Sequence, residues 1–355
     1  MRRRRVAVHA IAATALPLAL LVSQSPALAA DCPVPTDQWE YVDLGVEGVV
    51  SDINNSGQIV GELRGGASNG RAFLWQDGQL TVLPTLGGYP TGRATGIDDE
   101  GRIAGYSEAT DGKLHAFLWE GGQMRDLGLL GGKGVLTRGV KRGVVVGQVV
   151  TDWSTAAGQR AFRWQGGQAI RLNTSPASVG VAVNDAGQIA GTHKITPSAG
   201  PYSERTDRAF VWQGGVTRDL GTLGGNWSTA VAINDRGEVL GESAMDAGGV
   251  FSRGFVWSAA TGMRPLREEG SGGATPADIN DAGLIVGEYG CSSPYGDSYA
   301  GVWQGYDSRP LRLPDPGGAY TATPKAVNDK GEIAGFISNG VGAPRLVLWR
   351  PRTSG

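Results

Sequence analysis

The sequence is poor in the side chains that most often bind metals or attack substrates. Its 355 residues include two cysteines, three histidines and four methionines, and no cysteine or histidine cluster has the spacing of a zinc site. Charged residues make up 19% of the chain, too few for a charge-driven disordered segment. The 58 glycines show no triplet period, which excludes a collagen-like helix. We therefore expect no metal site and no cofactor.

After residue 30 the chain lacks any apolar run long enough to span a bilayer, so no membrane insertion is predicted. The first thirty residues differ from the rest. Residues 2–5 are arginines, residues 6–22 are mostly apolar, and an Ala-Leu-Ala triplet follows at residues 27–29. This order is typical of a secretory signal peptide. We expect residues 1–30 to be removed and the protein to be secreted, outside the cell or into its envelope.

Export also changes the charge balance and the state of the cysteines. The whole chain has a formal net charge of −2, and loss of its four leading arginines lowers this value to −6. A basic nucleic-acid footprint is therefore absent, and no nucleic acid is predicted as a partner. Cys32 and Cys291 both remain in the exported chain. Because secreted proteins usually oxidise their thiols, we predict a Cys32–Cys291 disulfide, although the sequence cannot show that its geometry is allowed.

A repeat dominates the exported chain. Seven tryptophans recur at spacings of 44 to 48 residues, and they number the repeats from 1 to 7: Trp75, Trp119, Trp164, Trp212, Trp257, Trp303 and Trp349. Each repeat has short apolar bursts separated by turn residues, with no helical periodicity, which predicts strands. We expect four strands per repeat, named a to d in chain order.

The expected turn between strands a and b reads Asn-Asp-x-Gly, as at residues 184–187. Asn and Asp form local side-chain hydrogen bonds there, and Gly supplies the positive φ that closes the hairpin. Repeat 3 departs from this pattern, because Lys141, Arg142 and Gly143 form a turn that is one residue shorter. We interpret all these turns as structural.

Four strands in a tandem repeat of about 45 residues are typical of a β-propeller blade. Repeat 7 ends after strand c, whereas residues 39–44 (WEYVDL) form an extra d-like strand before repeat 1. Pairing these two ends removes the open sheet edges. We therefore predict an all-β, seven-bladed β-propeller, closed by the N-terminal strand, as a single domain over residues 31–355 and as a monomer.

Two stretches carry a resemblance to a known family. Residues 115–119 read HAFLW and are followed by DLGLLGG at residues 126–132, while residues 208–212 read RAFVW and are followed by DLGTLGG at residues 219–225. The chain resembles the HAF-repeat family of secreted bacterial proteins over essentially its whole exported length. Repeats 5 to 7 depart at the first motif position. The resemblance implies an extracellular protein, and it implies no reaction.

The predicted binding face carries the b–c loops, which vary in length, and the d–a links, because variable loops on a rigid frame usually carry function. The repeat tryptophans are interpreted as core instead. On this face or at the cavity mouth we predict eight ligand-binding residues: Tyr89, Arg93, Arg138, Trp153, Trp227, Tyr295, Tyr320 and Lys325. Exposed aromatic and arginine side chains favour ligand contacts. A carbohydrate, a peptide or a small molecule is the expected partner.

Three further residues support an alternative. Asp52 and Asp278 are carboxylates at a strand-a position that is otherwise glycine or alanine, and His193 is placed by the sequence in the b–c loop of repeat 4. Desolvated carboxylates and a histidine can act as acid and base, so an extracellular hydrolase or lyase is the alternative to a binding module. The structural interpretation of the two aspartates is that they pair with Arg138 or Lys325.

Overall fold

The structure is a computed structural model that describes residues 34–68, 70–175, 177–195, 206–269, 273–291, 298–317 and 321–352. Apart from η1 (Gly66–Ser68) and η2 (Ala156–Gly158), every helix or strand in these ranges is a β-strand. The all-β prediction is therefore confirmed. The expected signal peptide (1–30), Cys32, Tyr295 and Tyr320 lie outside the described residues, and the Cys32–Cys291 disulfide stays a prediction.

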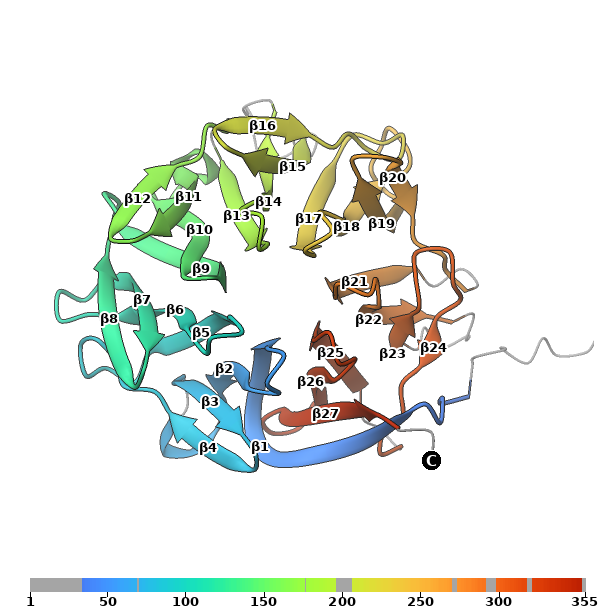
Figure 1. The fold of residues 1–355 in the computed structure, drawn as a ribbon, viewed down its shortest axis with the longest axis horizontal. Helices are drawn as coiled ribbons and strands as arrows, with labels where there is room; N and C mark the ends of the chain where they lie inside the picture. The colour runs from blue at the N-terminus through green and yellow to red at the C-terminus, as the bar shows by residue number, and fades with distance from the viewer. Residues whose placement is uncertain are drawn as a thin grey trace, which may run out of the picture.

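Repeats 2 to 6 each form one antiparallel sheet of four strands. Figure 1 shows these sheets arranged around a common centre, with the first strand of each sheet innermost. From the innermost strand outward, repeat 2 has β5 (Gly92–Ile97), β6 (Ile103–Glu108), β7 (Leu114–Glu120) and β8 (Gln123–Gly128), and repeat 3 has β9 (Gly134–Lys141), β10 (Val144–Val150), β11 (Gln159–Gln165) and β12 (Gln168–Arg171). In the same order, repeat 4 has β13 (Ser178–Val183), β14 (Ile189–Lys194), β15 (Asp207–Gln213) and β16 (Val216–Asp219), repeat 5 has β17 (Ser228–Ile233), β18 (Val239–Ala244), β19 (Ser252–Ser258) and β20 (Gly262–Pro265), and repeat 6 has β21 (Ala274–Ile279), β22 (Ile285–Gly290), β23 (Ser298–Trp303) and β24 (Leu311–Arg312).

Repeats 1 and 7 share the remaining sheet. Its strand order is β25-β26-β27-β1-β2-β3-β4, with β1 (Trp39–Ile53), β2 (Ile59–Leu63), β3 (Ala72–Gln76), β4 (Gln79–Val82), β25 (Thr321–Val327), β26 (Ile333–Ser338) and β27 (Arg345–Pro351). The first half of β1 pairs with β27, so that Tyr41 lies opposite Trp349 and Asp43 opposite Val347. Its second half pairs with β2. One long strand therefore joins the first repeat to the last, as Figure 1 shows at β1 and β27.

Contact between a glycine in strand b and a phenylalanine in strand c explains why these two residues recur together in the repeats. In repeat 2, Gly105 on β6 lies opposite Phe117 on β7, and Phe117 is fully buried. A Cβ atom at Gly105 would lie 2.3 Å from the Phe117 ring, so only glycine leaves space for the ring. Repeat 6 has Gly301 in place of the phenylalanine, and the buried Tyr289 ring fills that space instead.

The strand-c tryptophans are core residues, as predicted. Six of the seven are buried, and Trp119 is half-buried. Trp303 and Trp349 are fully buried, and their indole N–H groups donate to the carbonyl oxygens of Arg267 and Pro314 at 2.8 and 2.6 Å. These tryptophans stabilise the packing of the sheets, so they are not available as a stacking surface for a ligand.

Candidate functional site

Every innermost strand carries a β-bulge at the same place. The register of each a–b pair shifts by one residue just before the strand ends, which leaves one extra residue per repeat. The extra residues are Ser51, Thr95, Arg138, Val181, Val231, Ala277 and Lys325. A bulge re-aims side chains locally, and the seven extra residues comprise two hydroxyl, two basic and three apolar side chains. We call this set the bulge ring.

The bulge ring lines a cavity at the centre of the molecule. The cavity has a volume of about 230 Å³ and is lined by residues of the innermost strand of every repeat. It brings together four of the charged residues that the sequence predicts: Asp52, Asp278, Arg138 and Lys325. We call it the central cavity, and it is the candidate functional site.

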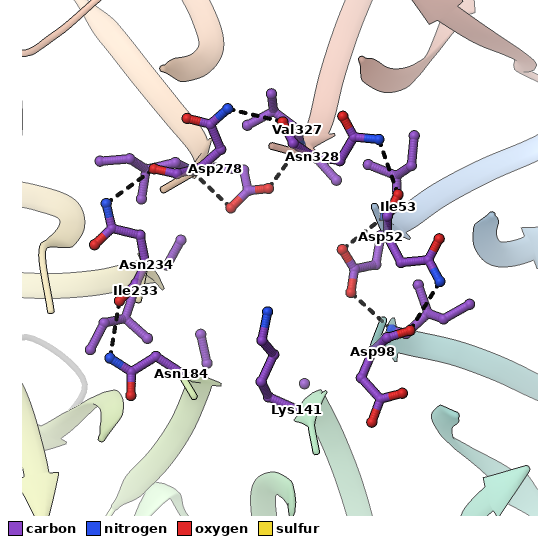
Figure 2. A pocket seen from close by; sticks show the side chains of 18 of the residues that line it. Asp52, Ile53, Asp98, Lys141, Asn184, Ile233, Asn234, Asp278, Val327 and Asn328 are labelled. Atoms are coloured by element: carbon purple, nitrogen blue, oxygen red, sulfur yellow. Dashed lines mark hydrogen bonds between the residues drawn. The ribbon is translucent and has the colours of Figure 1, made fainter. Parts of the chain in front are cut away.

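The Asn-Asp-x-Gly turns hold the repeats together around the central cavity. The side-chain amide of Asn280 donates to the backbone carbonyl of Asn328, and the amide of Asn328 donates to Asn54, at 2.9 and 3.0 Å. Asn54, Asn184 and Asn234 each donate in the same way to the next repeat, as Figure 2 illustrates. These five buried bonds cross five of the boundaries between repeats, which supports the structural interpretation of the turns.

In five repeats the second residue of the turn is an aspartate (Asp99, Asp185, Asp235, Asp281 and Asp329), and these residues form a ring of acidic side chains. The backbone N–H of Asp235, for example, donates to the Asp281 carboxylate at 2.6 Å, and the backbone N–H of Asp281 donates to the Asp329 carboxylate at 2.9 Å. The short turn of repeat 3 interrupts this pattern and brings in Lys141. Its ammonium lies 3.3, 3.6 and 3.8 Å from the carboxylates of Asp99, Asp235 and Asp185, and Figure 2 shows it directed toward the centre.

The role of Lys141 was not visible in the sequence. Burial lowers the pKa of its ammonium, but the carboxylates of Asp235, Asp99 and Asp185 raise it by more, so the pKa lies above its ordinary value. The missing turn residue was the one available signal, because it shows that repeat 3 differs at this point. Lys141 therefore supplies a central positive charge that partly offsets the acidic ring, and Arg142 adds a second one 2.6 Å from Asp185.

Asp52 and Asp278 do not pair with Arg138 or Lys325, so that interpretation is wrong. Each carboxylate accepts two backbone N–H groups, one from the next residue of its own strand and one from the innermost strand of the following repeat. Asp52 accepts from Ile53 and Ile97 at 2.8 and 2.9 Å. Asp278 accepts from Ile279 and Val327, both at 2.8 Å, as Figure 2 shows for Val327. The backbone amides of the bulged strands are nearer than any basic side chain, and each aspartate therefore links two repeats.

The two aspartates titrate far from their ordinary range. Burial raises the pKa of Asp52 from 3.8 to about 6, against the lowering effect of its two backbone N–H partners. Burial, and then the negative charge of Asp52, raises the pKa of Asp278 from 3.8 to about 7. Both carboxyl groups therefore exchange protons near neutral pH, which is a property of groups that act as acid or base.

Three basic residues in or beside the central cavity, Arg93, Arg138 and Lys325, have few partners. Arg93 on β5 donates to the Ser51 hydroxyl at 3.3 Å and lies 4.0 Å from the Glu62 carboxylate. Lys325 lies 5.7 Å from the centre of the Phe336 ring. Within the described residues, neither Arg138 nor Lys325 forms an ion pair. Burial and the nearby Arg93 lower the pKa of Arg138.

The structure corrects two predicted site residues. His193 does not lie in a loop: β14 continues past Gly191, and His193 pairs with Ser178 and Arg208, with its ring buried 5.2 Å from that of Phe210. Burial lowers its pKa. Trp227 is not exposed either, because only 5% of it is accessible and its indole N–H donates to Gly249 at 3.3 Å. Both residues pack within the sheets rather than facing a ligand.

Tyr89 and Trp153 are placed as a binding face requires. Tyr89, in the link between β4 and β5, is 45% exposed, and Trp153, in the loop after β10, is 56% exposed and lies over Gly134. Among the residues that the structure describes, no group of three or more His, Cys, Asp or Glu side chains is arranged to hold a metal ion. In the same residues, no helix has both the length and the apolar character needed to cross a bilayer.

No family model and no curated protein matches the sequence. Solved structures do match the fold. The β-propeller domain of the Trilobed protease from Pyrococcus furiosus is 12% identical, with 86% of this chain and 94% of that chain covered and a TM-score of 0.58. The structure of YCF48 bound to a D1 peptide is 12% identical, with 91% and 98% covered and a TM-score of 0.52.

A third similar structure belongs to an enzyme. The Pyrococcus horikoshii acylaminoacyl peptidase is 10% identical, and the match covers 88% of this chain but 53% of the peptidase, with a TM-score of 0.56. At these identities the similarity concerns the fold alone. The chain therefore has a β-propeller fold, and its function has to be argued from its own residues.

Proposed function

We propose that the exported chain is a secreted, seven-bladed β-propeller that works as a binding module, with its ligand held at the mouth that the b–c loops and d–a links form. The observation that carries the proposal is the central cavity, which residues from the innermost strand of every repeat line. Within the described residues, its Arg138 and Lys325 side chains form no ion pair, and such groups at a concave site are typical of ligand recognition.

Two sets of contacts support the closed, seven-bladed arrangement. The Asn328 side chain donates to the Asn54 carbonyl at 3.0 Å, so repeats 7 and 1 are joined by the same bond that joins their neighbours. In addition, the first half of β1 completes the sheet of repeat 7 as its fourth strand. Such a ring leaves no long sheet edge open to pairing with another chain.

The nature of the ligand is argued from the loop face. Exposed Tyr89 and Trp153 offer aromatic faces to a sugar ring or an apolar side chain, while Arg138 and Lys325 offer donors inside the cavity. A carbohydrate, a peptide or a small molecule fits this combination. The fold neighbour YCF48, which was solved with a bound D1 peptide, supports a peptide among these classes.

A thermal-shift screen of the exported chain against glycans, cell-wall fragments and peptides tests the binding module. A ligand that binds only the folded state raises the free energy of unfolding, by about 2.7 kcal/mol at a hundredfold excess over Kd, and the Tm rises with it. We expect such a ligand to lose at least tenfold in affinity in Tyr89→Ala or Trp153→Ala, because each removes an exposed aromatic contact.

Tyr306→Ala is the matched control. Tyr306 is 39% exposed, close to the 45% of Tyr89, but it lies in the c–d connection between β23 and β24. The control should bind as the unmodified protein does. Equal losses in all three variants, or no loss in any, would contradict a binding mouth on the loop face.

An extracellular hydrolase or lyase remains a second candidate on one observation. Asp52 and Asp278 line the same cavity and have pKa values of about 6 and 7, which suits an acid and a base at neutral pH. The buried His193 is no longer part of this candidate. Turnover of any glycan or peptide from the screen should then disappear in both Asp52→Ala and Asp278→Ala.

A further inference from the structure

A second cavity opens beside the central one, between repeats 4 and 5. It has a volume of about 280 Å³, just below the range of about 300–1,000 Å³ that is typical of small-molecule sites. Its lining consists of Arg138, Val179, Val181, Thr192, Asp207, Thr229 and Ala230. Arg138 and Val181 line both cavities. The two therefore meet at the Arg138 side chain, and we call the second one the side pocket.

Arg138 belongs to the bulge ring, and other repeats form the same bulge with an uncharged residue. At the same position, repeats 4, 5 and 6 have Val181, Val231 and Ala277. Across the part of the chain that the structure describes, the guanidinium donates no hydrogen bond and forms no ion pair. Its five N–H groups are therefore available to a ligand, in a fork that matches a carboxylate.

The walls of the side pocket define what accompanies the anionic group. Val179, Val181 and Ala230 are aliphatic. Thr192 accepts the Ala230 N–H at 3.1 Å, so its own hydroxyl hydrogen can be donated to an oxygen in the pocket. Asp207 lies on the same lining. The pocket therefore favours an anionic group at Arg138 that is attached to a small branched apolar one.

We infer that Arg138 binds the carboxylate of a ligand whose neighbouring aliphatic group fills the side pocket. The inference rests on the proposed binding module and names the chemistry of its ligand. The C-terminus of a peptide that ends in valine or a similar residue has this chemistry, and so does a free branched carboxylic acid. The inference needs no covalent step.

The test is a calorimetric titration of the exported chain with N-acetyl-L-valine and with N-acetyl-L-valinamide. The acid is expected to bind at least tenfold more tightly than the amide, because the amide offers no negative charge to the guanidinium. A peptide with a free C-terminal valine that binds more tightly than N-acetyl-L-valine identifies the polypeptide source. Equal binding of the two identifies a small acid. Either result supports the inference.

Variants of Arg138 separate charge recognition from folding. Arg138→Val places in repeat 3 the residue that repeats 4 and 5 already have, so the sheet should keep its Tm while binding of the acid falls at least tenfold. Arg138→Lys keeps the charge but not the fork, and an intermediate loss is expected. Arg264→Gln, on the exposed surface of β20, is the matched control and should bind normally.

Three outcomes would overturn the inference. They are equal binding of acid and amide, unchanged binding by Arg138→Val, and tighter binding of glucuronate than of N-acetyl-L-valine, which would assign the pocket to a sugar acid. If binding of another ligand still requires Tyr89 and Trp153 in any of these cases, the binding module stands and only the carboxylate assignment is wrong. If no ligand requires Tyr89, Trp153 or Arg138, the binding module and the carboxylate assignment are both wrong.

Discussion

The Lys141→Gln variant is expected to lose about 2–4 kcal/mol of the free energy of unfolding at low ionic strength. This loss lies between the typical losses on breaking an exposed ion pair and on breaking a buried one. The Lys141 side chain is 24% exposed and lies within 3.8 Å of three carboxylates. Without its charge, these aspartates and their neighbours Asp281 and Asp329 repel one another across the ring. Glutamine keeps the size of the side chain and removes only the charge.

Urea unfolding at low salt and in 1 M NaCl measures this effect. Because salt at about 1 M shortens the screening length to about 3 Å, it should restore part of the stability of Lys141→Gln. Lys330→Gln is the matched control, since Lys330 is exposed in the corresponding turn of repeat 7. A Lys141→Gln variant as stable as Lys330→Gln at low salt would contradict this role of the Lys141 charge.

Stability is expected to fall as the pH rises from about 4 to about 7. The pKa values of Asp52 and Asp278 rise on folding from 3.8 to about 6 and about 7. Between these limits the folded protein holds protons that the unfolded chain has lost, so higher pH favours unfolding. After allowance for solvent in the cavity, the two groups should account for a loss on the order of 2–3 kcal/mol. The effect is complete only about one pH unit above the higher of the two pKa values, at about pH 8.

Asp52→Ala/Asp278→Ala is the variant that isolates this contribution. Alanine already stands at this position in repeats 4, 5 and 7, as Ala182, Ala232 and Ala326, so the backbone accepts it. Free energies of unfolding from urea titrations should decline with pH in the unmodified protein and stay flatter in the variant. Parallel curves for the two proteins between about pH 4 and about pH 7 would contradict the assignment.

Much of the fold could be predicted because the same packing contacts recur in each repeat and require the same residue types there. The period of the tryptophans predicts the sheets, and the glycine opposite a phenylalanine in strands b and c marks a close approach that a Cβ would prevent. The extra strand at residues 39–44 was predicted by its likeness to strand d, and it pairs with β27. Each of these features depends on particular residue types at fixed positions, and a sequence shows residue types directly.

The site could be predicted only in part, for two physical reasons. A bulge is a backbone feature, and its extra residue is Ser, Thr, Arg, Val, Ala or Lys in different repeats, so no residue type marks it. The sequence predicted that Arg138 and Lys325 lie near the centre, but it did not reveal that a bulge directs them there. The end of a strand is likewise unmarked where no turn residue follows, as for His193, which the sequence placed in a loop.

The site combines two opposite charge environments along one axis. The turn residues form an acidic ring that Lys141 partly offsets, and the bulge ring above it contributes Arg138 and Lys325 without acidic partners. An anionic group is therefore expected beside the bulge ring and not at the acidic turns. This division favours a ligand on the side of the b–c loops and d–a links, in which the exposed Tyr89 and Trp153 lie.

The closed ring on which this account depends can be tested by a disulfide cross-link between positions 40 and 350, introduced as Glu40→Cys/Arg350→Cys. Glu40 and Arg350 are exposed and lie opposite each other on β1 and β27. The account predicts that the bond forms in the folded protein, appears as a joined peptide in mass mapping, and raises the Tm, because it constrains a very long loop in the unfolded chain. A bond that forms only after unfolding, or that lowers the Tm, would contradict closure by the N-terminal strand.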